Sequence, residues 1–453
     1  MNKKVLGFWD LLLFSFCAIF GIEAIATAAA IGPPAISWWL IFIIGYFLPF
    51  GLISAELGST YPEQGGLYAW VKRAFGNRWA ARTTWYYWIS LPIWIPAIYI
   101  AFAEIAGRMF FPGLTLWDQV LIGILMIWVT VAVNILPLRS SKWVTNIGSA
   151  TKILVVIGMF AAAIYFFLSR GHFANAISLP DMLPGWNSAV VFIPIIMYNL
   201  LGCELVSSAA GEMKDPKRDV PRAVISSALA IALLYLVSTF LVWAVVPASE
   251  INVSSGIMQM FAAAFGSQGA GAAITVVLGL SVIFTLFAGV VAWTLGSNRT
   301  MAEAAAEGEM PAIFGKMTKN DAPLGASVIS GLISTFVIVV YWFFADNAAE
   351  MFWQVTAFCL AVDLFAYLVI FPAFIRLRHS DRNIVRPYRV PGPDWLAYIL
   401  AIVAELFILT TVMILLVQPG QDFVWTSLPI IVGSVISVVV GEILINRSLR
   451  RSF

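Results

Sequence analysis

Two carboxylates lie inside long apolar stretches of this chain, and each follows a glycine by two residues. The first stretch contains Gly21-Ile22-Glu23, and a later one contains Gly202-Cys203-Glu204. A carboxylate in the middle of a membrane span costs several kcal/mol unless it is paired or hydrated, so it usually marks a functional site. An acid in such a position can bind an ammonium group or carry a proton.

Two further acids and one base lie deep in apolar stretches. The acids are Asp363 and Glu405, and the base is Lys152. Together with Glu23 and Glu204 they make an excess of acids within the spans, which favours a cationic substrate or a proton path. Lys152 has a second interpretation, because we expect it in the first turns of the fifth span, and a lysine near the end of a span can extend its amine to the cytoplasmic face.

The composition is typical of a polytopic membrane protein. Hydrophobic residues make up 61% of the 453 residues and charged residues only 11%, and the mean hydropathy is +0.91. A soluble domain of this length could not bury so much apolar surface. Cys17, Cys203 and Cys359 fall singly in separate stretches, without metal-binding spacing or a disulfide framework. We expect no cofactor, no enzymatic activity and no nucleic-acid partner, because no catalytic or phosphate-binding motif occurs.

Twelve stretches of the sequence are long enough to cross a bilayer, which takes about 20 residues. They predict helices, because a backbone in lipid must satisfy its own hydrogen bonds. An even number of spans places both termini on the same side of the membrane. The predicted spans are residues 8–31, 36–60, 80–107, 117–136, 146–168, 188–211, 221–247, 271–304, 325–345, 350–376, 394–417 and 424–447.

The basic residues predict which side of the membrane faces the cytoplasm. They concentrate on the side of the termini, in segments such as Lys72–Arg78, Lys214–Arg222 and Arg376–Arg389. Only Arg108 and Arg170 fall on the opposite side. This bias predicts a multi-pass protein of the plasma membrane with both termini in the cytoplasm. We interpret Arg376–Arg389 as a topology signal and not as a nucleic-acid site.

The glycines at positions 21 and 202 predict breaks in the first and sixth spans. Because the sixth span follows the first by an odd number of spans, a second five-helix unit would run inverted relative to the first. Broken helices at matching positions of two inverted halves indicate a binding site at the membrane midplane. The alternative for each glycine is close helix packing. The predicted units are residues 1–168 and 188–376, followed by peripheral helices in 394–447.

Three motifs, in order along the chain, resemble those of amino acid–polyamine–organocation transporters. Gly202–Ala223 is similar to the helix 6 signature of that family, a G-x-E followed by A-G-E and N-P, with Asp215 in place of the usual Asn. Ala55–Trp70 resembles the loop after helix 2, and Ala292–Ala302 with Met310–Phe314 resembles helix 8 and its exit. The chain looks closest to bacterial glutamate/GABA antiporters and to polyamine uptake transporters. The resemblance implies an all-α fold of the LeuT type, with five plus five inverted helices, unwound helices 1 and 6, and transport by alternating access.

The resemblance also implies a substrate site at the break of helix 1. Family members carry G-S-G or G-x-G there and offer backbone N–H groups to a substrate carboxylate. Here Gly21 is kept, Ile22 follows, and Glu23 replaces the last glycine. A charged acid would repel a carboxylate and attract an ammonium by about 4 kcal/mol at about 4 Å in a dielectric of about 20. The alternatives are that Glu23 caps the second half of its own helix or stays neutral.

Further substrate-binding residues follow from the same resemblance. In the triplet Gly202-Cys203-Glu204, the acid matches one that senses protons or lies near the substrate. Its alternative role is a hydrogen bond to the unwound backbone. Tyr198 matches a gating aromatic, and Trp293 matches an aromatic that stacks on the substrate, as aromatic faces do with organic cations. Trp94 is a candidate for the same cavity, although packing is the simpler interpretation.

Lys152 and Asp363 complete the implied set, with Glu204, as coupling or gating residues. Lys152 resembles a helix 5 lysine that takes the place of a sodium ion in several family members, which argues against sodium coupling. Asp363 lies near the centre of helix 10. Glu405 is set aside, because helix 11 is peripheral in the implied fold.

The sequence therefore predicts a secondary active transporter of small amino-bearing metabolites. We expect it to prefer amines or polyamines, taken up with protons or exchanged, without sodium. The first alternative is an amino acid permease or an amino acid/amine antiporter, in which Glu23 is neutral or turned away. The second is a transporter-like receptor that binds without moving solute. The expected partners are the substrate and the lipid bilayer, and the sequence leaves open whether the chain forms a homodimer.

Overall fold

We describe the fold from a computed structural model of the chain. The structure describes residues 7–63, 66–136, 138–175, 178–184, 193–208, 213–266, 268–417 and 427–450. These residues form helices and their connections, with no strand among them. Eleven stretches within the described residues are long and apolar enough to cross a membrane. The prediction of an all-α membrane protein is therefore confirmed.

Eleven of the predicted spans coincide with these stretches, and their ends differ by a few residues. The first consists of α1 (Phe8–Ile19) and α2 (Ile25–Ala29). The second consists of α3 (Ala35–Phe42) and α4 (Leu48–Thr60), joined by a π-helical turn at Ile43–Phe47. The others are α6 (Asn77–Phe110), α7 (Leu116–Asn134), α8 (Leu138–Arg170), α11 (Pro216–Val245), α13 (Gly269–Ala306), α14 (Leu324–Trp342), α15 (Ala348–Tyr367) with α16 (Ile370–Ser380), α17 (Asp394–Val417) and α18 (Ser427–Leu449).

Both predicted helix breaks are present. In the first span, α1 ends at Ile19 and helical structure resumes in a single 3₁₀ turn, η1 (Ile22–Ala24), before α2. In the sixth span, residues 200–204 separate α9 (Ile193–Asn199) from α10 (Leu205–Ser208). Residues 188–192 and 209–211 of the predicted sixth span lie outside the described residues. Neither described half is long enough to cross a membrane, which explains why eleven stretches are found instead of twelve.

Two shorter helices were not predicted, α5 (Leu67–Phe75) and α12 (Gly256–Phe265). Helix α5 lies between Gly66 and Gly76, whose φ angles of 49° and 83° are left-handed, a conformation that glycine adopts readily. Both helices are much shorter than a bilayer is thick. A search for stretches of about 20 apolar residues therefore does not detect them.

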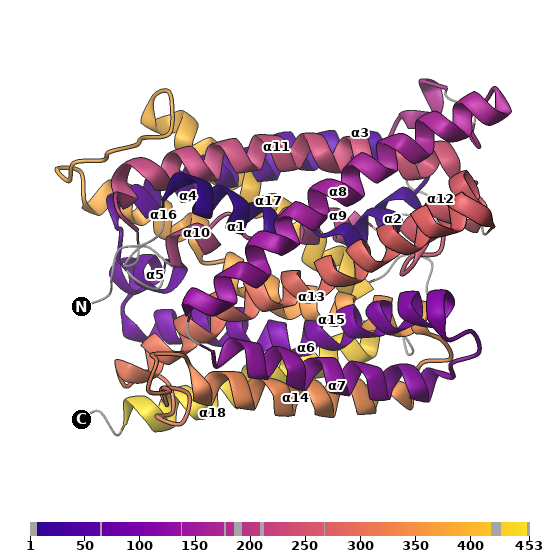
Figure 1. The fold of residues 1–453 in the computed structure, drawn as a ribbon. Helices are drawn as coiled ribbons and strands as arrows, with labels where there is room; N and C mark the ends of the chain where they lie inside the picture. The colour runs from indigo at the N-terminus through magenta and orange to yellow at the C-terminus, as the bar shows by residue number, and fades with distance from the viewer. Residues whose placement is uncertain are drawn as a thin grey trace.

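The long helices run side by side across the view of Figure 1, and the broken spans lie among them. Helix α6 is the most deeply buried of the described spans, and it packs against α15, α13 and α7. Helix α1 packs against α11, α8 and α13. The breaks are therefore surrounded by protein, as a backbone that leaves helical geometry within a membrane must be. The division into two inverted units remains a prediction.

Candidate functional site

The break in the first span is closed by a tyrosine from α11. The hydroxyl of Tyr235 accepts a hydrogen bond from the backbone N–H of Gly21 at 2.6 Å and donates one to the carbonyl of Ile19 at 2.5 Å. A hydroxyl can do both at once, so it satisfies backbone groups that the helix leaves unpaired. The ring of Tyr235 stacks on Trp39 with a centroid distance of 4.7 Å. No pattern in the sequence pointed to this tyrosine.

Gly21 leaves room for the carboxylate that follows it. A Cβ atom at Gly21 would lie 2.8 Å from Oε1 of Glu23 and 3.2 Å from Oδ1 of Asn199. Both distances are shorter than ordinary contacts, so a side chain at position 21 would displace these oxygens. Glu23 is partly exposed, and Tyr198 donates a long hydrogen bond of 3.4 Å to its Oε1. Tyr198 and Glu23, both predicted site residues, are thus brought together.

Lys152 lies at the same break and not at the membrane surface. Its side chain is buried, and its ammonium donates hydrogen bonds to the carbonyl of Cys17 at 2.5 Å and to that of Phe20. The expectation that it lies in the first turns of its helix is wrong, because α8 begins at Leu138, about four turns earlier. The alternative that Lys152 extends to the cytoplasmic face is therefore also wrong.

The break in the sixth span faces the end of α1 and an indole from α13. Gly202 has a φ of +106°, in the region that favours glycine. A Cβ there would lie 3.0 Å from Cγ1 of Ile19 and 3.1 Å from Cζ2 of Trp293. The indole N–H of Trp293 donates a hydrogen bond of 2.8 Å to the carbonyl of Ala18. Trp293 therefore contacts both breaks, and its role in substrate binding stays a prediction.

Four aromatic side chains form a continuous row beside the breaks, which we call the aromatic row. Its members are Tyr198, Trp94, Trp293 and Tyr87, and each neighbouring pair of rings has a centroid distance of 6.4 Å. Trp94 is buried, and its indole N–H has no hydrogen-bond partner among the described residues. A buried donor without a partner is uncommon. Trp94 thus packs within the aromatic row, and its role in substrate binding stays a prediction.

A carboxylate lies at each end of the aromatic row. At one end, Tyr198 contacts Glu23, as described above. At the other end, the hydroxyl of Tyr87 donates a hydrogen bond of 3.0 Å to Oε1 of Glu204, and Tyr367 donates a second one of 2.8 Å. The other oxygen of Glu204, Oε2, has no partner among the described residues. Glu204 therefore pairs with two tyrosines, and the backbone N–H groups of Gly202 and Glu204 in the unwound segment also lie close to its carboxylate, so both of its predicted roles stay predictions.

Asp363 lies close to this second acid. Its side chain is buried in α15, and Ser90 donates a hydrogen bond of 3.1 Å to its Oδ1. Its carboxylate is near enough to that of Glu204 for the two to interact electrostatically. A proton bound to one of them would relieve the repulsion between them. Tyr87 and Ser90, three residues apart on α6, thus hold the two predicted coupling residues.

Three candidates lie away from the row. The side chains of Ile22 and Cys203 are each 1% exposed and belong to the hydrophobic core, so Ile22 offers only backbone to the site. Glu405 lies on α17, in a groove between α16 and α17. This position agrees with the prediction that Glu405 is not part of the substrate site.

Comparison with known proteins identifies the family. Residues 6–440 match the amino acid permease family, which covers nearly the whole chain. The chain belongs to this family. The predicted resemblance to amino acid–polyamine–organocation transporters is therefore confirmed. This family consists of transporters and gives no reason to expect an enzyme in this permease.

Individual relatives of this permease align with most of its length. A probable agmatine/putrescine antiporter of Lactococcus lactis subsp. lactis is 31% identical, and the alignment covers 99% of this chain and 96% of the relative. An uncharacterized transporter of Legionella pneumophila is 26% identical over 93% of this chain and 91% of its own. A glutamate/gamma-aminobutyrate antiporter of Lactococcus lactis subsp. lactis is 24% identical, and the alignment covers 86% of this chain and 80% of the relative.

Proposed function

We propose that this permease exchanges small organic amines that carry a positive charge at each end. The observation behind the proposal is the aromatic row with Glu23 at one end and Glu204 at the other. Carboxylates attract ammonium and guanidinium groups, and aromatic faces attract organic cations. A diamine offers two such charges and an apolar chain between them, which matches this order of groups.

The names of the relatives support an amine and also define the second candidate. One relative is named as a probable agmatine/putrescine antiporter, and both of these compounds carry two basic groups. Another is named as a glutamate/gamma-aminobutyrate antiporter, which favours an amino acid/amine exchange instead. A substrate carboxylate at the break of the first span would meet Glu23, at a cost of about 4 kcal/mol when the two are about 4 Å apart. We therefore place the amine first.

Lys152 supports transport without sodium. Its ammonium donates hydrogen bonds to the carbonyl oxygens of Cys17 and Phe20. Backbone carbonyl oxygens are also the groups that coordinate alkali cations. A fixed positive charge there repels a second cation. We propose that Glu204 and Asp363 take the coupling proton when transport is not a simple exchange. Tyr87 and Ser90 of α6 donate hydrogen bonds to the two carboxylates, and Oε2 of Glu204 has no hydrogen-bond partner among the described residues.

The proposal includes a plasma-membrane location with both termini in the cytoplasm, which the bias of basic residues supports. The native cysteines are buried, so single cysteines can report on each side. A cysteine at Asn320 should react with an impermeant maleimide only from the inside, and one at Phe111 only from the outside. Both positions are exposed. The reverse labelling pattern would show that the topology is the inverse of the proposed one.

Exchange in liposomes tests the substrate. Liposomes that contain the purified protein and unlabelled putrescine should take up labelled putrescine or agmatine faster than liposomes without internal amine. Glu23→Gln removes the charge with little change of shape, and we expect amine uptake to fall at least about tenfold. The matched control is Glu405→Gln, the same change on a peripheral helix, which should leave uptake near the wild-type rate.

The other outcomes separate the alternatives. Exchange of glutamate or other amino acids alone, with Glu23→Gln neutral or beneficial, would favour the amino acid antiporter. Binding of amines without any exchange would favour a receptor. Both results would contradict the proposed amine exchanger.

A further inference from the structure

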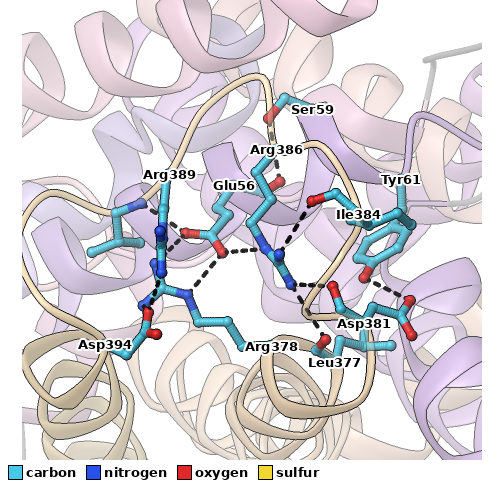
Figure 2. A network of polar contacts seen from close by, with 11 residues as sticks. Glu56, Ser59, Tyr61, Leu377, Arg378, Asp381, Ile384, Arg386, Arg389 and Asp394 are labelled. Atoms are coloured by element: carbon cyan, nitrogen blue, oxygen red, sulfur yellow. Dashed lines mark hydrogen bonds and ion pairs between the residues drawn. The ribbon is translucent and has the colours of Figure 1, made fainter.

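The segment from the end of α16 to the start of α17 carries a cluster of arginines that the transport site does not use. Two of them are fixed by a buried acid of α4. Glu56 pairs with Arg378 at 3.0 Å and with Arg386 at 3.2 Å, and it accepts a hydrogen bond from the backbone N–H of Val390 at 2.7 Å. Figure 2 shows these groups converging on the carboxylate. The segment is therefore held in a defined position against α4.

A pocket of about 590 Å³ opens beside this network. Four guanidinium groups line it, with one acid, Asp394, and Glu56 directly behind. Four positive charges against two negative ones leave the pocket with a net positive charge of two. Among the described residues, the side chain of Arg382 has one hydrogen bond, with His379 at 2.9 Å, and no ion pair. The lining residues are Arg378, His379, Arg382, Ile384, Arg386, Arg389, Asp394 and Tyr398.

An apolar groove of about 820 Å³ adjoins the basic pocket. The two cavities share His379 and Tyr398 in their walls. The groove runs between α16 and α17, both parts of membrane-spanning stretches. Its walls are mainly apolar, and Ile402 and Leu406 on α17 are more than half exposed. A charged pocket near the helix ends thus continues into an apolar channel along the spans.

We propose that the pocket and the groove together bind one anionic phospholipid. The phosphate would lie among the guanidinium groups, which bind phosphate oxygens in a bidentate manner, and an acyl chain would fill the groove. Basic pockets between membrane helices bind anionic lipid headgroups in this way. Glu405, the acid of the groove, lies seven residues beyond Tyr398 on α17, about 10 Å further along the helix. It therefore faces the chain and not the phosphate.

The apolar groove favours a lipid over a soluble anion as the occupant. Free phosphate would need the arginines alone and would gain nothing from the apolar walls. A lipid uses both cavities, and its apolar chain is stabilised where the spans face the bilayer. The arginine segment then has a binding role in addition to its role in topology.

The test measures stabilisation of the purified full-length protein in neutral detergent. Phosphatidylglycerol should raise the melting temperature, and phosphatidylcholine should not. In the double variant Arg382→Gln/Arg389→Gln, both changed residues are exposed, and we expect the apparent affinity for phosphatidylglycerol to fall about tenfold. The matched control Lys316→Gln/Lys319→Gln removes the same charge from another exposed loop and should keep the wild-type affinity.

A second pair of variants tests the groove. Ile402→Trp fills it and should also weaken phosphatidylglycerol binding, whereas Ile399→Trp, on an exposed position of α17 outside the groove, should not. Equal losses in the two double variants would overturn the specific site in favour of general charge attraction. Stabilisation by inorganic phosphate or glycerol phosphate alone, unaffected by Ile402→Trp, would overturn the lipid in favour of a free anion.

Discussion

The hydroxyl of Tyr235 spans the break at Gly21, 2.6 Å from the backbone nitrogen of that glycine. The same hydroxyl donates to the carbonyl of Ile19, so one side chain satisfies groups on both sides of the break. An unwound backbone in a membrane is costly unless its polar groups have partners. Tyr235 thus stabilises the break by giving these two backbone groups a hydrogen-bond partner.

Tyr235→Phe tests this role. The change removes only the hydroxyl, and it leaves a buried N–H and a buried carbonyl without their partner, which costs about 1–3 kcal/mol. We expect a lower melting temperature and slower amine exchange. Tyr165→Phe makes the same change at an exposed position of α8 and serves as the control. A melting temperature for Tyr235→Phe equal to that of the control would show that the bridge contributes nothing.

Lys152→Met tests the cation at the first break. The variant keeps a long apolar side chain, but the carbonyls of Cys17 and Phe20 lose their donor. We expect a loss of stability of about 1–3 kcal/mol and a large fall in exchange, while Lys319→Met, in an exposed loop, should change neither. Wild-type exchange should be the same in sodium and choline buffers. A requirement for sodium in the wild type would refute the role of Lys152 as a substitute cation.

Gly202→Ala tests the geometry of the second break. An alanine there must hold a φ of +106°, and its Cβ would lie 3.1 Å from the ring of Trp293. We expect a cost of about 1–3 kcal/mol and weaker binding of putrescine, measured by melting temperature and by titration. Gly51→Ala is the matched control, because its Cβ would meet only Ala228 at an ordinary 3.5 Å. Normal binding by Gly202→Ala would mean that the break adapts freely.

Glu56→Gln tests the ion network that Glu56 forms with Arg378 and Arg386. The side chains of Glu56 and Arg378 are each 2% exposed, and the removal of one partner from a buried pair costs about 3–5 kcal/mol, because the other charge stays buried. Glu442→Gln breaks a more exposed pair with Arg82, so we expect it to cost only about 0–1 kcal/mol. Thermal unfolding of both variants measures the difference. Similar melting temperatures would show that Glu56 and Arg378 are not a buried pair in solution.

The sequence located the acids and the breaks because these signals are local. A charge or a glycine inside an apolar run stands out without any knowledge of its neighbours. Tyr235 could not be found in this way, because a tyrosine in a span is unremarkable and its partner Gly21 is 214 positions away. The same holds for Tyr87, which completes the aromatic row.

The depth of Lys152 was misjudged for a different reason. The hydropathy of the fifth span begins near residue 146, but α8 extends back to Leu138, because a helix continues through polar residues once it has formed. Whether Lys152 contacts the first span depends on how α8 packs against α1. That packing is a tertiary property, and no local pattern contains it.

Trp293 belongs to neither broken span, yet it contacts both. Its indole N–H holds the carbonyl of Ala18 at one break, and its ring lies against Gly202 at the other. A ligand that displaces or tilts this ring therefore changes the surroundings of both breaks in a single movement. Occupancy of the site would then act on the first and sixth spans together, so that neither span could respond to a ligand alone.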